Sequence, residues 1–107
     1  MSRDRYAIFS HWMAQHGFIR EHKFHHSRKW RLDYAHTGLL IALEVEGGIW
    51  IFGKHNRGTG YINDIEKYNA ATLAGWALLR CTPQHIESGE AYKLVETALK
   101  ELDPTKP

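Results

Sequence analysis

The sequence predicts an α/β fold, with a hairpin-fed sheet flanked by helices. Three observations support this fold class: segments with helical periodicity alternate with short strand-like segments, glycine, proline or polar turns separate them, and no repeat or linker divides the chain. The predicted order is α-β-β-β-α-β-α, compatible with an α/β or α+β sandwich of undetermined sheet order. With 107 residues the chain forms one domain (1–107), with a core at about 3–82 and a C-terminal helix at about 86–102.

The first predicted elements are a helix at residues 3–16 and strands at 18–24 and 30–35. The helix is amphipathic, because large apolar residues recur at helical spacing until Gly17 ends it. Both strands alternate apolar and polar residues, as strands with one buried face do. The polar residues 25–29 form the turn between the two strands.

The next two segments differ sharply in composition. Residues 39–46 are nearly continuous in apolar residues, which is typical of a central buried strand, and a short hairpin-like connection precedes them. Residues 47–60 contain five glycines among fourteen residues, together with several basic side chains. We predict a mobile basic loop there, and a loop of this length in a compact domain is often functional.

The second half of the chain predicts a helix, a strand and a final helix. Thr59 or Asn63 is the candidate cap of the first helix, and Gly75 ends it. The strand covers residues 76–82 and stops at Pro83, and the last amphipathic helix covers 87–102. One side of the first helix is formed by Ile62, Ile65, Tyr68, Asn69, Thr72 and Leu73.

Composition excludes several classes of protein. No apolar run approaches the roughly 18 residues that span a bilayer, and the N-terminus has no signal-peptide pattern. The only cysteine, Cys81, cannot form a disulfide within the chain, and its apolar surroundings predict a buried, inert thiol. We therefore expect a protein of the cytoplasm, in a bacterium or a phage-infected host cell, with no membrane partner.

Basic residues are concentrated in the first third of the chain. Residues 1–31 carry seven lysines and arginines against two acids, whereas the remainder carries seven against ten. Five histidines add to this region, and Lys29 and Arg31 lie at its end. Such a distribution is typical of a surface that binds a polyanion, although a solvated charged face would have the same composition.

The apolar segment 39–46 ends in two carboxylates. Glu44 and Glu46 are two residues apart, so a strand projects them from the same face, and the short hairpin brings Asp33 beside them. Three converging carboxylates repel one another unless a cation neutralises them. Hard oxygen ligands favour Mg²⁺ or Mn²⁺. The alternative is that the acids are solvated or paired with lysine or arginine where the strand emerges.

These segments resemble the PD-(D/E)XK nuclease superfamily, especially its short stand-alone phage-type and very-short-patch-repair-like members. The resemblance covers about residues 19–82. It implies a restriction-endonuclease-like αβββαβ core with a central mixed four-stranded sheet, followed here by an extra C-terminal helix. The segments that carry it are Arg31-Leu32-Asp33-Tyr34, Ile41-Ala42-Leu43-Glu44-Val45-Glu46-Gly47-Gly48, Asp64-Ile65-Glu66-Lys67, Gly75-Trp76 and Leu78-Leu79-Arg80.

The resemblance also implies roles for individual residues. Asp33 and Glu44 match the two metal-binding acids, and the carbonyl of Val45 matches a third ligand. Glu46 stands where most members have lysine. Either Glu46 helps to bind a second metal and orients water, or Lys67 supplies the positive charge from the following helix. The implied activity is phosphodiester hydrolysis of DNA with Mg²⁺ or Mn²⁺.

Further candidates for DNA contact lie in and beside the glycine-rich segment. Lys54, His55 and Arg57 are placed to bind phosphate near the scissile bond, and Trp50 follows the acids closely enough to contact DNA. Ordinary exposed loop polarity is the competing explanation for the three basic residues.

Two other functions fit the same sequence. Because Glu46 replaces the usual lysine, the chain could be a nucleic-acid-binding module that has lost catalysis. It could also be a small phage or host interaction protein, which would bind neither DNA nor metal. One site nicks one strand, so cutting both strands in one encounter would call for a homodimer.

Overall fold

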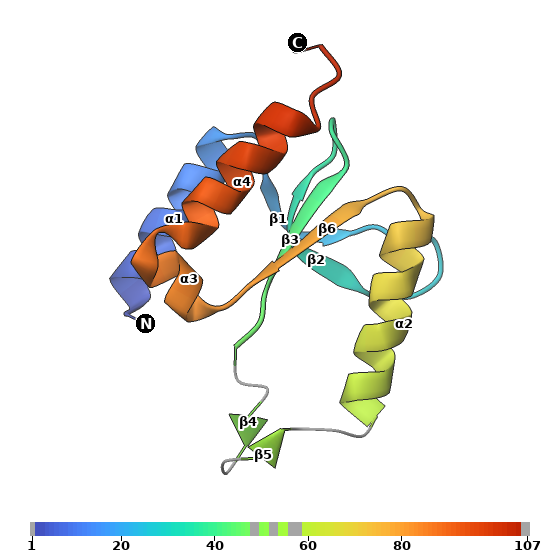
Figure 1. Ribbon diagram of the computed structural model, residues 1–107. Helices are drawn as coiled ribbons and strands as arrows, with labels where there is room; N and C mark the ends of the chain where they lie inside the picture. The colour runs from blue at the N-terminus through green and yellow to red at the C-terminus, as the bar shows by residue number, and fades with distance from the viewer. Residues whose placement is uncertain (1, 48–49, 52–53, 56–58, 106–107) are drawn as a thin grey trace.

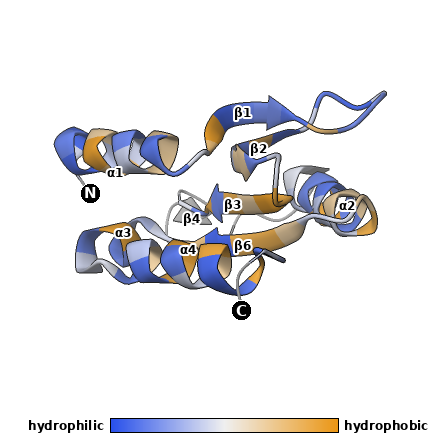
Figure 2. Ribbon diagram, turned by 90° about the horizontal axis from the view of Figure 1, so that it is seen from above, coloured by the Kyte–Doolittle hydropathy of each residue, from blue (hydrophilic) through white to orange (hydrophobic). Residues whose placement is uncertain are grey.

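The fold described here is that of a computed structural model, for residues 2–47, 50–51, 54–55 and 59–105. For residues 50–51, 54–55 and 59 the description is limited to the backbone. The molecule has three layers, with a sheet between helices on both of its faces (Figures 1 and 2). The predicted α/β class and the four-stranded mixed sheet are confirmed.

The sheet contains four strands in the order β1-β2-β3-β6. Strands β1 (Ile19–Lys23), β2 (Arg31–His36) and β3 (Ile41–Val45) form an antiparallel meander, as their short connections predict. Strand β6 (Ala77–Cys81) lies parallel to β3. A parallel neighbour needs a crossover connection, and the helix between β3 and β6 provides it. The predicted α-β-β-β-α-β order of the core is therefore confirmed.

Three helices cover one face of the sheet. They are α1 (Arg3–Gln15), α3 (Pro83–Ser88) and α4 (Glu90–Glu101), and the rings of Trp12 on α1 and Tyr92 on α4 are in contact, with centres 4.9 Å apart. Large apolar side chains fill the space between these helices and the sheet, including Phe9, Met13, Tyr34, Leu43 and Val95, each with no exposed surface. The predicted buried thiol of Cys81 belongs to this core, and burial raises its pKa to about 11.

Of the helices in the described part of the chain, α2 (Thr59–Leu73) is the one that covers the opposite face of the sheet. Its cluster is smaller, because most of the side chains between helix and sheet are short. The fully or nearly fully buried members are Leu32, Ala35, Ala42, Ala71 and Trp76.

The prediction that Asn63 caps this helix is wrong, because α2 already begins at Thr59, the other candidate. The apolar side that the sequence suggested is also turned outward in large part: Ile62, Ile65 and Leu73 are exposed, whereas Ala71 is buried. The sheet beneath the helix presents alanines and a carboxylate, so short and polar residues of α2 fit against it better than isoleucine does.

The C-terminal region differs from the single predicted helix. Pro83 ends strand β6 but also begins helix α3, and Thr82 caps that helix through its hydroxyl. Gly89 has a left-handed φ of 88° and separates α3 from α4, which starts at Glu90. The predicted start at residue 87 missed this break, because the apolar residues that indicated the helix all lie in α4 and do not define where it begins.

The glycine-rich segment is not a loop throughout. Strands β4 (Trp50–Ile51) and β5 (Lys54–His55) pair in antiparallel fashion and form a small sheet of their own, between β3 and α2 in the chain. Among the helices of the described residues, none has the length and apolar character to cross a membrane.

Candidate functional site

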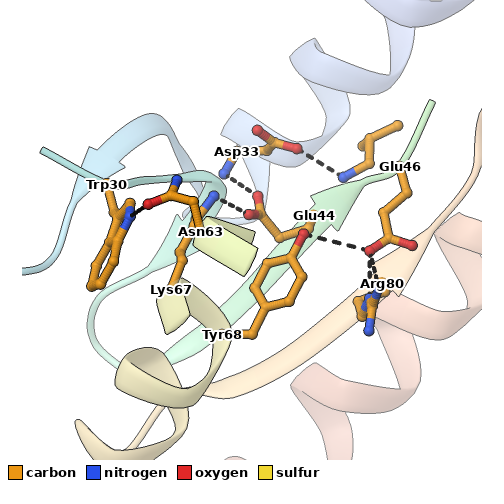
Figure 3. Close-up of polar contacts among 9 residues, drawn as sticks. Trp30, Asp33, Glu44, Glu46, Asn63, Lys67, Tyr68 and Arg80 are labelled. Atoms are coloured by element: carbon orange, nitrogen blue, oxygen red, sulfur yellow. Dashed lines mark hydrogen bonds and ion pairs between the residues drawn. The ribbon is translucent and has the colours of Figure 1, made fainter. Parts of the chain in front are cut away.

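Asp33 and Glu44 lie opposite each other on neighbouring strands. The paired register of β2 and β3 ends at Tyr34 and Leu43, and Asp33 and Glu44 are the next residues along the two strands. The backbone amide of Asp33 donates to Oε2 of Glu44 at 2.7 Å, and the amide of Val45 donates to Oδ2 of Asp33 at 2.8 Å. Each carboxylate thus bonds to the backbone of the other strand (Figure 3).

Strands β1 and β2 depart from regular strand geometry beside Asp33. Glu21 of β1 lies at the register position opposite Asp33 and has a φ of 54°, which is uncommon for a residue with a side chain. Leu32 and Ala35 both pack in the cluster under α2, although strict alternation would send them to opposite faces. The alternation is therefore broken at Asp33, between Leu32 on the α2 side and Tyr34 on the opposite side of the sheet.

Lys67 of α2 completes this group. Its ammonium forms an ion pair with Oε1 of Glu44, and the two side chains are only 14% and 4% exposed. Burial raises the pKa of Glu44 to about 7, against the opposing effects of the Lys67 and Asp33 hydrogen bonds, and the charge of Asp33 raises it further. A second positive charge beside Glu44 would therefore lower the pKa of Glu44 and favour its ionised form.

Glu46 does not join the other two acids. Its Oε1 forms an ion pair with Arg80 of β6 and accepts a hydrogen bond from the Tyr68 hydroxyl at 3.5 Å. The guanidinium of Arg80 also lies 4.9 Å from the centre of the Tyr68 ring. Within the described residues, no group of three His, Cys, Asp or Glu side chains is close enough together to hold a metal ion. The predicted cluster of three carboxylates is instead two carboxylates and a lysine.

The donor set at Asp33 and Glu44 still suits a hard divalent cation. Two carboxyl groups lie side by side, and Val45, whose carbonyl the resemblance implied as a ligand, is held there by the hydrogen bond that its backbone N–H donates to Asp33. Carboxylate and carbonyl oxygens are the ligands that Mg²⁺ takes from proteins, usually one or two with water completing the shell. We conclude that Asp33, Glu44 and Val45 fit such an ion, and that Glu46 is engaged elsewhere.

A second polar group lies one helical turn from Lys67. The amide oxygen of Asn63 accepts hydrogen bonds from Trp30 Nε1 at 3.0 Å and from the Arg28 guanidinium at 2.8 Å. The same guanidinium lies 3.9 Å from the centre of the Trp30 ring and 3.5 Å from Glu66. This network fixes the turn between β1 and β2 against α2, beside the carboxylates (Figure 3).

The turn also lines a cavity of about 500 Å³ beside α2. Lys29 and Arg31, both predicted to contact nucleic acid, are exposed at this turn. The side chains of the other candidates, Trp50, Lys54 and His55, lie outside the described residues, as does Arg57 altogether. The residues that line the cavity are Ser27, Arg28, Lys29, Trp30 and Asn63.

Sequence reasoning missed the partners that organise the site. Arg80 was expected only as part of a strand, although the parallel register places it beside Glu44 and next to Glu46. Asn63 was considered only as a cap. The available signal was the spacing of Asn63 and Lys67, because residues four apart on a helix share one side.

Comparisons of the chain with protein-family models, with curated proteins and with solved structures found no match.

Proposed function

We propose that this chain is a divalent-metal-dependent nuclease that hydrolyses phosphodiester bonds of DNA at Asp33, Glu44 and Lys67. We also propose that its core is the restriction-endonuclease-like one that the sequence resemblance implies. The proposal rests mainly on one observation, the hydrogen bond that joins Asp33 to Glu44 just beyond the paired register of β2 and β3, with the Lys67 ammonium on Glu44.

The chain's own groups suit this chemistry in three ways. Asp33 and Glu44 would hold the cation, which when bound would neutralise phosphate charge and lower the pKa of water. Their two backbone hydrogen bonds fix the carboxyl groups before substrate arrives. Lys67 is close enough to Glu44 to place a positive charge beside a bound phosphate, where negative charge increases during attack by water.

The position of Glu46 favours one of the two roles left open by the sequence. Its carboxylate is tied to Arg80 and Tyr68, so it is engaged in charge pairing away from Asp33. Lys67 then takes the place of the lysine that most members of the superfamily carry two residues after the second acid.

The substrate surface would extend along the turn between β1 and β2. Arg28 and Trp30 are anchored on Asn63 of α2, and Lys29 and Arg31 are exposed beside them. Lysine and arginine bind the phosphate backbone without reading base sequence. We therefore expect a shape preference, such as branched or damaged duplex in phage recombination or repair.

The test is cleavage of labelled linear, flapped and four-way-junction DNA in Mg²⁺, in Mn²⁺ and in EDTA. We expect products only with the metals, and a loss of at least about a hundredfold in rate for Asp33→Asn, because the cation is worth several kcal/mol. Asp64→Asn, an exposed acid on α2, is the matched control and should cleave normally. Unchanged cleavage by Asp33→Asn would overturn the proposal.

A second candidate is a nucleic-acid-binding module that cuts nothing. The observation that favours it is the pairing of Glu46 with Arg80, which leaves two carboxylates and no third acidic ligand among the described residues. Binding of the same DNAs in EDTA, with no product in either metal, would establish this candidate in place of the nuclease.

A further inference from the structure

A cavity of about 510 Å³ lies between the start of helix α1 and strand β1. Its size is that of a site for a small molecule. Among the described residues that line it, none is an aspartate or a glutamate, whereas two are arginines. The lining consists of Ser2, Arg3, Tyr6, Ala7, Ser10 and Arg20.

The two arginines of this cavity have no acidic partner. In the part of the chain that the structure describes, none of the ion pairs involves Arg3 or Arg20. A neighbouring cavity differs in this respect, because Arg5 and Glu87 line it together. Two guanidinium groups at one cavity repel each other, and an anion between them removes that cost.

The guanidinium of Arg20 is held in place by aromatic rings. Its central carbon lies 5.5 Å from the centre of the Tyr6 ring and 5.7 Å from the centre of the Tyr34 ring. Tyr34 has no exposed surface, and its hydroxyl forms a hydrogen bond of 2.6 Å with the hydroxyl of Ser10. Aromatic rings attract a cation without using its N–H groups, so these donors remain available to the oxygens of a ligand.

We propose that this cavity binds a phosphate monoester, with the terminal phosphate between Arg3 and Arg20. A monoester carries about two negative charges at pH 7, which balance two guanidinium groups, whereas a phosphodiester carries a single charge. Guanidinium N–H groups bind phosphate oxygens in pairs, and the hydroxyls of Ser10 and Tyr6 supply further donors at the same cavity. Free nucleotides and the phosphorylated ends of nucleic acids share this chemistry.

The cavity is separate from the candidate cation site. Arg20 is the register partner of Tyr34, which belongs to the core on the α1 side of the sheet. Lys67 and Glu44 meet on the α2 side. Binding of a monoester therefore does not depend on the proposed nuclease activity. If the chain cuts DNA, the same cavity would favour strands with a phosphorylated end.

The first test is calorimetric titration of the full chain in EDTA with matched ligands. They are a thymidine trinucleotide with a 5′-phosphate, the same trinucleotide with a 5′-hydroxyl, and the same trinucleotide with its 5′-phosphate methylated to a diester. We expect the monoester to bind at least about tenfold more tightly than the other two, because it alone brings the second charge. Equal affinity for the monoester and either of the other forms would overturn the proposal.

Adenosine 5′-monophosphate separates the two sources of the monoester. An affinity equal to that of the phosphorylated trinucleotide would support a free nucleotide as the ligand. A weaker affinity would support the end of a nucleic acid.

The second test assigns the binding to the two arginines. Arg20→Gln should lower the affinity for the phosphorylated trinucleotide at least about tenfold. Arg3→Gln should lower it in the same direction, and it changes an exposed side chain at the start of α1, outside the core. Arg5→Gln is the matched control, because it removes the same charge from the same helix but lines another cavity. Equal losses for Arg5→Gln and Arg20→Gln would show that net charge alone attracts the ligand, which would contradict the proposal.

The third test locates the ligand by the chemical shifts of backbone amides in isotope-labelled protein. The phosphorylated trinucleotide should shift the amides of residues 2–10 and 19–21, which surround the cavity, more than those of residues 43–46. Shifts confined to residues 43–46 would place the phosphate at the candidate cation site and refute binding at this cavity.

Discussion

The two faces of the sheet are packed in different ways. On the face covered by α1, α3 and α4, large side chains form one continuous core, in which the ring of Phe9 meets Tyr34 and Tyr92 edge to face at 5.6 and 5.1 Å. On the face covered by α2, the buried cluster is small and contains three alanines. The buried ion pair of Glu44 and Lys67 lies on this second face.

One face of the sheet therefore provides most of the buried apolar area, whereas the other carries the candidate site. Buried apolar area is the main source of folding free energy, so the first face stabilises the sheet. The second face has space for charged side chains, because a helix above alanines needs few large residues to fill the layer. A buried carboxylate costs free energy in such a place, and that cost is acceptable only because the other face holds the strands in position.

The largest effect should come from the first face. Phe9→Ala removes a fully buried ring, and we expect the free energy of unfolding to fall by about 4 kcal/mol. Phe24→Ala, on a half-buried ring packed against the cluster under α2, should cost clearly less. Urea unfolding followed by circular dichroism measures both values. Equal losses would mean that the two faces contribute alike.

The next effect concerns the buried ion pair. Lys67→Met leaves Glu44 buried without its partner, and because the pKa of Glu44 is already raised to about 7, the loss should be largest where the carboxylate is ionised, about 3 kcal/mol at pH 9. Adding Glu44→Gln to the same chain removes the unpaired charge and should recover most of this loss. Lys93→Met, on the exposed side of α4, is the control and should change the free energy of unfolding by less than about 0.5 kcal/mol. A double variant less stable than Lys67→Met alone would contradict this account.

A smaller effect is expected where the β1–β2 turn meets α2. Asn63→Ala removes the acceptor of Trp30 and Arg28, which should cost about 1 kcal/mol and shift tryptophan fluorescence to longer wavelength. Asn69→Ala is the matched control, because it makes the same substitution on the exposed side of the helix. Identical spectra for the two variants would show that the turn does not depend on Asn63.

Much of the fold could be predicted from local patterns. The first helix and the four strands of the sheet lie close to their predicted positions, because alternation and continuous apolar runs report how many faces of a strand are buried. The break at Gly89 and the small β4–β5 sheet were missed. Both depend on the backbone conformation of one or two residues, which apolar periodicity does not register.

The candidate site was predictable in part for a similar reason. Strand periodicity and a short hairpin are local properties, and they were enough to place Asp33 beside Glu44. The position of Glu46 could not be predicted in this way, because its partner Arg80 lies on a strand that is distant in sequence and parallel to β3.

The sequence by itself therefore determined the order of the elements, the buried thiol of Cys81 and the pairing of Asp33 with Glu44. Only the tertiary structure decided which side of α2 meets the sheet. A helix with apolar residues on one side and Asn63 and Lys67 on another can pack either way, and the choice depends on the surface beneath it. Here that surface contains a buried carboxylate among Leu32, Ala35 and Ala42, and a buried carboxylate without a partner costs several kcal/mol, so the side of α2 that carries Lys67 faces it.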